Sequence, residues 1–100
     1  MRSIRVLLES ATVGSVPLEL EQGHLHVVLR EGDEAPGPSD WELLLVTEAT
    51  TDVRPGAHRV RLLTLDGHDL QGRALVRFSD GHRHLLRGDG DLGGVELVLG

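Results

Sequence analysis

The alternation of apolar and polar residues with a period of two constrains the fold of this chain more than any other feature. Ile4, Val6 and Leu8 form one such series, and the same spacing recurs in residues 16–20 and 25–29. Side chains two residues apart project from the same face of an extended strand, so this pattern predicts half-buried β-strands. We expect an all-β fold of about eight short strands, either an antiparallel β-sandwich or a small closed barrel, with no substantial helix.

The Asp-Gly pairs at 66–67 and 80–81 mark tight turns in the C-terminal half of the chain. Asp-Gly favours two-residue β-hairpins because both central positions of the turn require a positive φ. The predicted C-terminal three-stranded meander spans residues 58–65, 69–79 and 82–87. Its strands carry apolar residues on both faces. Either the sheet coils at Gly72, so that both faces are covered, or one face is an assembly surface.

The N-terminal half contains one further predicted hairpin. Gln22-Gly23 separates two alternating segments and predicts a two-residue turn within an 18–27 hairpin. Pro17 lacks an N–H donor, so pairing either ends at Leu18 or the second strand lies at a sheet edge. Residues 41–47 are almost continuously apolar, which predicts a central strand covered on both faces.

Two loops and a final strand complete the predicted elements. Residues 31–40 contain acidic residues, two prolines and two glycines, and residues 88–94 are rich in Gly and Asp. Both compositions are typical of loops. Residues 95–99 are again apolar and predict a last strand.

The length and composition indicate one soluble domain spanning residues 1–100. The chain has no cysteine, which excludes disulfides, a thiol nucleophile and a cysteine zinc site. The first nine residues carry too short an apolar cluster for a signal peptide, and no segment has transmembrane length. Lysine and asparagine, which have AT-rich codons, are both absent. We therefore expect a bacterial, cytoplasmic protein with no membrane partner.

Charge is distributed unevenly along the chain. Residues 1–52 contain ten acidic residues and three arginines, whereas residues 53–88 contain seven arginines and three aspartates. The net charge of the whole chain is −6, and it has only one Trp, one Phe and no Tyr. Single-strand nucleic-acid binders and carbohydrate-binding faces both rely on aromatic stacking. We therefore expect neither class of ligand.

The basic meander offers one candidate ligand site. Arg73 and Arg77 are predicted to share a strand face with His82 and His84. Guanidinium groups bind phosphate and carboxylate bidentately, so these four residues form a candidate site for an anion or small ligand. The alternative is that the arginines are solvated or pair with the acidic N-terminal strands.

The 18–27 hairpin offers a second candidate site. His24 and His26 are two residues apart, and the predicted turn places them opposite Glu21 and Glu19. Two imidazoles and two carboxylates on one face are a ligand set for a divalent metal such as zinc or iron(II). The alternative is that the His–Glu pairs stabilise each other without a metal. No other cofactor is indicated.

The chain offers no convincing catalytic group. Ser79, Asp80 and His82 are the residue types of a nucleophilic triad, but Asp80 occupies the predicted turn and is not placed to orient the imidazole. We therefore expect a non-catalytic β-domain that acts as a protein interaction or assembly module. Its partner is another protein or a second copy of the chain, forming a homodimer through the apolar meander or an open sheet edge.

Overall fold

A computed structural model describes residues 2–29, 38–95 and 98, and its described part is built from seven antiparallel β-strands. The strands are β1 (Arg2–Val13), β2 (Val16–Leu18), β3 (Leu20–Leu29), β4 (Pro38–Thr47), β5 (Gly56–Thr64), β6 (Asp69–Ser79) and β7 (Arg83–Gly93). They form one sheet in the order β2-β1-β3-β4-β7-β6-β5, and β1 also pairs with β5. The predicted all-β class is confirmed, and of the two predicted architectures the chain adopts the closed barrel. Six strands close the barrel and β2 is the additional strand.

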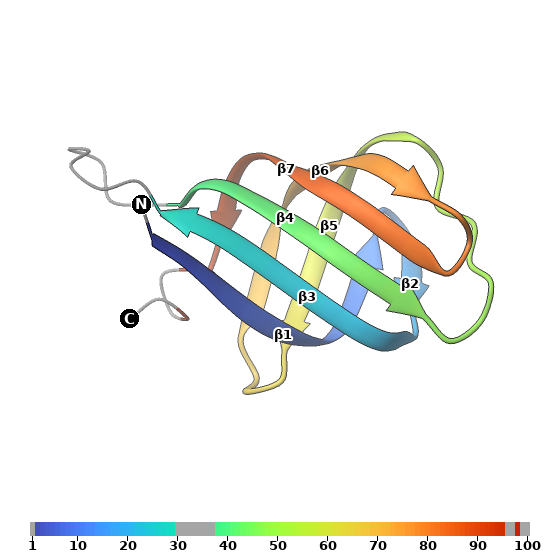
Figure 1. The fold of residues 1–100 in the computed structure, drawn as a ribbon, viewed down its shortest axis with the longest axis horizontal. Coiled ribbons are helices and arrows are strands. Elements are labelled where there is room, and N and C mark those ends of the chain that lie inside the picture. Colours follow the sequence, from blue (N-terminus) through green and yellow to red (C-terminus); the bar gives the residue numbers. More distant parts are fainter. Residues whose placement is uncertain (1, 30–37, 96–97, 99–100) are drawn as a thin grey trace.

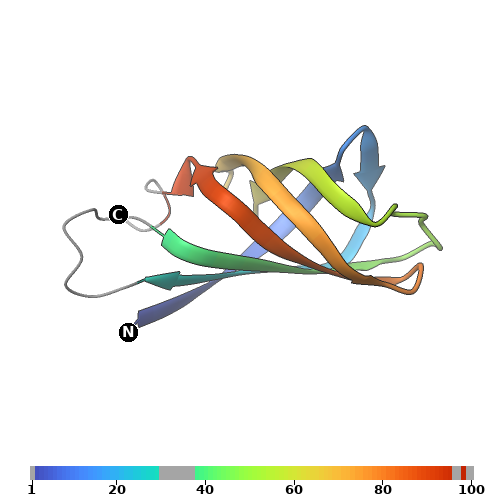
Figure 2. The ribbon, with the colours of Figure 1, turned by 90° about the horizontal axis from the view of Figure 1, so that it is seen from above.

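Strand β1 closes the barrel because its two halves pair with different strands. Residues 2–7 pair with β3, and the segment from Leu8 to Val13 pairs with β5. The register shifts between Leu8 and Ser10, where the strand bends from one partner to the other. Figure 1 shows β1, β3 and β4 side by side with β5 and β6 crossing behind them, and Figure 2 shows the two layers from above.

The predicted hairpin at 18–27 is wrong, because Gln22 and Gly23 lie within β3. The N-terminal hairpin turns instead at Gly14-Ser15, where Gly14 has a φ of +61°. Gly23 is buried, and a Cβ there would lie 3.0 Å from the Cβ of Leu8. The glycine therefore serves close packing at the bend of the barrel rather than a turn. β2 pairs with β1 alone, which confirms the predicted edge position of Pro17.

The three-stranded meander is confirmed, but β7 is longer than predicted. Residues 88–93 continue β7, so the predicted loop at 88–94 is wrong. The glycines there make room for Trp41, whose ring lies against Gly88 and Gly72 and whose Nε1 donates to the carbonyl of Gly90 at 2.9 Å. Most of the predicted strand at 95–99 and of the predicted loop at 31–40 lies outside the described residues. The described residues of the former, Val95 and Val98, are helical, so the strand prediction is wrong at these positions. Within the described part of that loop, residues 38–40 begin β4.

The barrel interior is filled by the inward side chains of the alternating strands. Strand β4 is central, between β3 and β7, as predicted. The prediction that β4 is covered on both faces is wrong, because Trp41, Leu43 and Leu45 are buried whereas Leu44 is 42% exposed. The other fully enclosed apolar side chains come from β3, β5, β6 and β7, and include Leu25, Val27, Val60, Leu62, Leu70 and Leu86.

The contact between Trp41 and Gly88 yields a stability prediction. A methyl group at Gly88 would overlap the indole, so we expect G88A to lower the free energy of unfolding by about 1–3 kcal/mol, measured by urea denaturation. In a W41L background, the loss of stability caused by G88A should fall well below that value, because the smaller side chain leaves room for the methyl group. Equal losses in wild type and in W41L would show that Trp41 does not limit the space at Gly88.

Candidate functional site on the outer face

A row of largely apolar side chains crosses five neighbouring strands on the outside of the barrel. Cross-strand pairing places Leu7 beside His24, His24 beside Leu44, Leu44 beside Leu85, and Leu85 beside Phe78. The four apolar members are between 37% and 52% exposed. We call these five residues the apolar row. Large exposed apolar side chains are ordinary when scattered, but a contiguous set marks an interaction surface.

A β-bulge in β6 is the reason that Phe78 belongs to this row. The pairing with β7 shifts between Val76 and Phe78, so Arg77 is an extra residue without a cross-strand partner. The bulge reverses the alternation after Val76. Val76 packs against the core, whereas Phe78 is 52% exposed beside Leu85. The sequence alternation alone places both residues on one face and so does not reveal the row.

A second row, parallel to the first, carries charge. Arg5 pairs with His26, His26 with Glu42, and Glu42 with Arg87. We call these four residues the charged row. Among the described residues, no ion pair involves Arg5, Glu42 or Arg87. The row therefore presents one acidic and two basic groups whose charges are not neutralised by an ion pair with another described residue.

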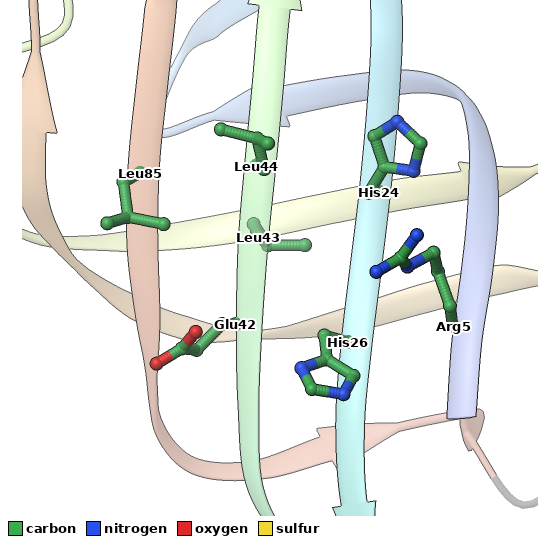
Figure 3. Close-up of a pocket in the computed structure, with 7 residues that line it drawn as sticks. All are labelled: Arg5, His24, His26, Glu42, Leu43, Leu44 and Leu85. Carbon is green, nitrogen blue, oxygen red and sulfur yellow. The ribbon is translucent and has the colours of Figure 1, made fainter. Parts of the chain in front are cut away.

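The two rows meet in a shallow groove of about 290 Å³ over β1, β3, β4 and β7. It is lined by Arg5, His24, His26, Glu42, Leu43, Leu44 and Leu85. Figure 3 shows the guanidinium of Arg5 directed between the rings of His24 and His26, with the carboxylate of Glu42 directed toward β7. Nδ1 of His24 is buried and has no hydrogen-bond partner. The groove therefore combines three basic side chains, an unsatisfied ring nitrogen and an apolar wall.

The predicted metal ligands do not come together. His24 and His26 share the outer face, but their cross-strand neighbours are Leu7, Arg5, Leu44 and Glu42 rather than the two predicted glutamates. Glu19 lies between β2 and β3 and Glu21 at the irregular start of β3, and both are exposed. In the described part of the chain, no three His, Asp or Glu side chains are grouped closely enough to hold a metal. The difference follows from the missing turn at Gln22-Gly23.

The predicted anion site is also divided, because His84 points into the barrel. His84 is fully buried, and its Nδ1 lies 2.7 Å from Ser79 Oγ while its Nε2 lies 3.3 Å from Thr47 Oγ1. The prediction that it shares a face with Arg73 and Arg77 is therefore wrong. A neutral ring satisfies this network, with Ser79 donating to Nδ1 and Nε2 donating to Thr47. Neither ring nitrogen is available to a ligand.

The other three residues of the predicted anion site are also held apart. Arg73 lies directly opposite Arg59 on β5 and forms an ion pair with Asp89 at 3.6 Å. Arg77 is the exposed bulge residue of β6. His82 is held at the β6–β7 turn by Thr50, whose Oγ1 lies 3.1 Å from its Nε2. The basic residues of the meander therefore do not converge as the sequence predicts.

Sequence reasoning missed Arg5 and Glu42 as members of a site. Their outward direction follows from the alternation in β1 and β4, so the signal for their shared face is present in the sequence. Their place beside His26 depends on β1, β3 and β4 being neighbours in that order, with the observed register. That order requires the chain to turn at Gly14-Ser15. The sequence does not predict this turn, because Gln22-Gly23 resembles a hairpin turn more closely.

Comparisons with protein-family models, with curated proteins and with solved structures find no match to this chain. The groove and the two rows are therefore interpreted from their own geometry. Among the residues that the structure describes, no helix is long and apolar enough to cross a membrane.

The enclosure of His84 predicts a pH dependence of stability. Burial lowers the pKa of His84 and the nearby His82 lowers it further, although Asp80 and a backbone hydrogen bond act in the opposite direction. In the unfolded chain the group titrates near pH 6.5, so below that pH the unfolded state binds a proton that the folded state does not. We expect the free energy of unfolding to fall as pH is lowered from 7.5 to 5.5, by at most about 1.4 kcal/mol per pH unit from this group.

Urea denaturation of wild type and H84Q over this pH range tests that expectation. H84Q removes the titrating group and retains hydrogen-bonding capacity, so its stability should depend less on pH, whatever its absolute stability. Identical pH slopes for the two proteins would show that His84 is not the group responsible.

Proposed function

We propose that this chain is a non-catalytic assembly module that forms a homodimer through the apolar row. The observation that carries the proposal is the adjacency of Leu44, Leu85 and Phe78 on three neighbouring strands. Together they expose three large apolar side chains on one side of a barrel whose interior is already filled. Burial of such a patch between two molecules releases water from apolar surface on both.

The charged row favours a second copy of the chain as the partner. A twofold axis that lies in the interface, parallel to β4 and β7 and between them, places β4 of one copy face to face with β7 of the other. Because Glu42 pairs with Arg87 within the sheet, this axis sets Glu42 against the second copy's Arg87. It also sets Leu44 against the second copy's Leu85. The face is thus complementary to itself in both charge and apolar character.

Chemical considerations support a binding role over a catalytic one. Ser79 and His84 are within hydrogen-bond distance, as nucleophile and base are in hydrolases. However, His84 is fully buried and both of its ring nitrogens are engaged, so it is closed to a substrate. We interpret this network as a means of filling one end of the barrel with satisfied polar groups. The lack of cysteine and the codon bias of the composition favour a bacterial cytoplasm as its location.

Light scattering over a range of protein concentrations tests the homodimer. We expect wild type to change from monomer to dimer as concentration rises. L85E should raise the dimer dissociation constant at least about tenfold, because it places a carboxylate in the middle of the apolar row. V16E is the matched control, because Val16 and Leu85 are both 37% exposed but Val16 lies on β2, outside the row.

Two results would contradict the proposal. One is a strict monomer at all concentrations. The other is equal weakening by L85E and V16E, which would indicate a general effect of added charge. Weakening by L85E of binding to a different protein, in a chain that stays monomeric by itself, would keep the surface but replace the proposed occupant.

A further inference from the structure

We infer that the groove between Arg5, His24 and His26 binds an oxyanion, a carboxylate or phosphate group attached to an apolar body. This inference goes beyond the proposed homodimer, because the charged groups that carry it lie on β1 and β3. The apolar wall of the groove, formed by Leu44 and Leu85, is shared with the proposed dimer interface, so ligand and second copy would compete for it. The sequence predicted a metal ligand set at His24 and His26. In the structure, Arg5 and Glu42 lie beside His26 in place of the two expected glutamates, and the positive charge of Arg5 favours an anion over a metal cation as the ligand.

The charge of Arg5 is the first argument. Arg5 lies directly opposite His26, and its guanidinium is directed between the two imidazoles. No described carboxylate forms an ion pair with it. A fixed positive charge beside two imidazoles repels a metal cation and attracts an anion. The planar N–H groups of arginine also match the two oxygens of a carboxylate or phosphate.

The unsatisfied nitrogen of His24 is the second argument. Its Nδ1 is buried and lacks a hydrogen-bond partner, because its cross-strand neighbours, Leu7 and Leu44, have apolar side chains. Buried polar atoms in native proteins are nearly always paired, and an unpaired one requires an explanation. Because this nitrogen has no exposed surface, an anion oxygen reaches it only when the His24 ring turns toward the groove, and it would then accept a hydrogen bond from the protonated nitrogen. A bound oxyanion thus pairs with both the guanidinium of Arg5 and Nδ1 of His24.

The opposite wall determines which anion fits. Leu44 and Leu85 line the groove across from Arg5, and the carboxylate of Glu42 turns toward β7 and away from the guanidinium. An anion at Arg5 therefore does not have to displace Glu42. The volume of about 290 Å³ is near the lower limit of small-molecule sites, so the ligand is compact. These features favour an anionic head group at Arg5 and an apolar body against the leucines.

NMR titration of the full chain with phenyl phosphate and with benzoate tests this inference and separates phosphate from carboxylate recognition. We expect the ring signals of His24 and His26 to shift with saturation. R5Q should raise the dissociation constant at least about fivefold, because it removes the charged fork. R61Q is the control for loss of one positive charge, because Arg61 is exposed on β5 and pairs with Asp69 outside the groove. It should change the constant less than about twofold.

Replacement of the imidazoles provides a second readout. The charged groups facing the two imidazoles are Arg5 on β1 and Glu42 on β4. H24Q and H26Q together should raise the dissociation constant for benzoate, followed by amide shifts, while Arg5 retains residual binding.

The outcomes separate this inference from the proposed homodimer. Titrations are repeated in F78E, which disrupts the apolar row outside the groove and keeps the chain monomeric if the dimer is correct. Saturable binding in F78E that is lost in R5Q supports the anion site independently of the dimer. Failure of both anions to shift either histidine ring, or equal loss in R5Q and R61Q, would overturn it.

Discussion

The double pairing of β1 is the constraint on which the rest of the structure depends. One half of the strand is bonded to β3 and the other half to β5, so the sheet has no free edge along its six barrel strands. An open sheet would leave the inward residues of β5 and β6 without cover. Closure defines a single inside, and the alternation along each strand then divides every residue between a filled interior and an outer face.

Because side chains fill the interior of the barrel, a ligand or partner binds on its outer face. Trp41 occupies the space above Gly72 and Gly88, and a Cβ at Gly72 would lie 3.0 Å from the indole. His84, Ser79 and Thr47 fill the end of the barrel near the β6–β7 turn with hydrogen-bonded polar groups. Barrels of this size hold side chains rather than large ligands. The exposed leucines, Phe78 and the unpaired charges therefore stand out as the features that packing does not explain.

Local signals were sufficient to predict much of the fold. The alternating segments and the positions of the two Asp-Gly pairs predict the meander correctly, and Pro17 correctly marks an edge. The predicted two-residue Asp-Gly turns are wrong, because neither Asp has a positive φ and Ser79 pairs with His84. The wrong predictions concern residues whose role is determined by tertiary packing rather than by the local sequence. Gly23 and Gly88 look like turn or loop residues in the sequence, but each accommodates a neighbouring side chain, and the bulge at Arg77 has no sequence signal. The candidate site depends on strand order, so only the histidine pair could be identified in advance.

The central claim is that this protein acts through the outer face formed by the apolar and charged rows. Amide NMR spectra of wild type, recorded on dilution from high to low concentration, test it most directly because every residue is observed separately. We predict that the shifts that change with dilution cluster at outward residues of β4, β6 and β7, with Leu44, Leu85 and Phe78 at their centre. Dilution-dependent shifts confined to β2 and β5, or a spectrum independent of concentration, would contradict the claim.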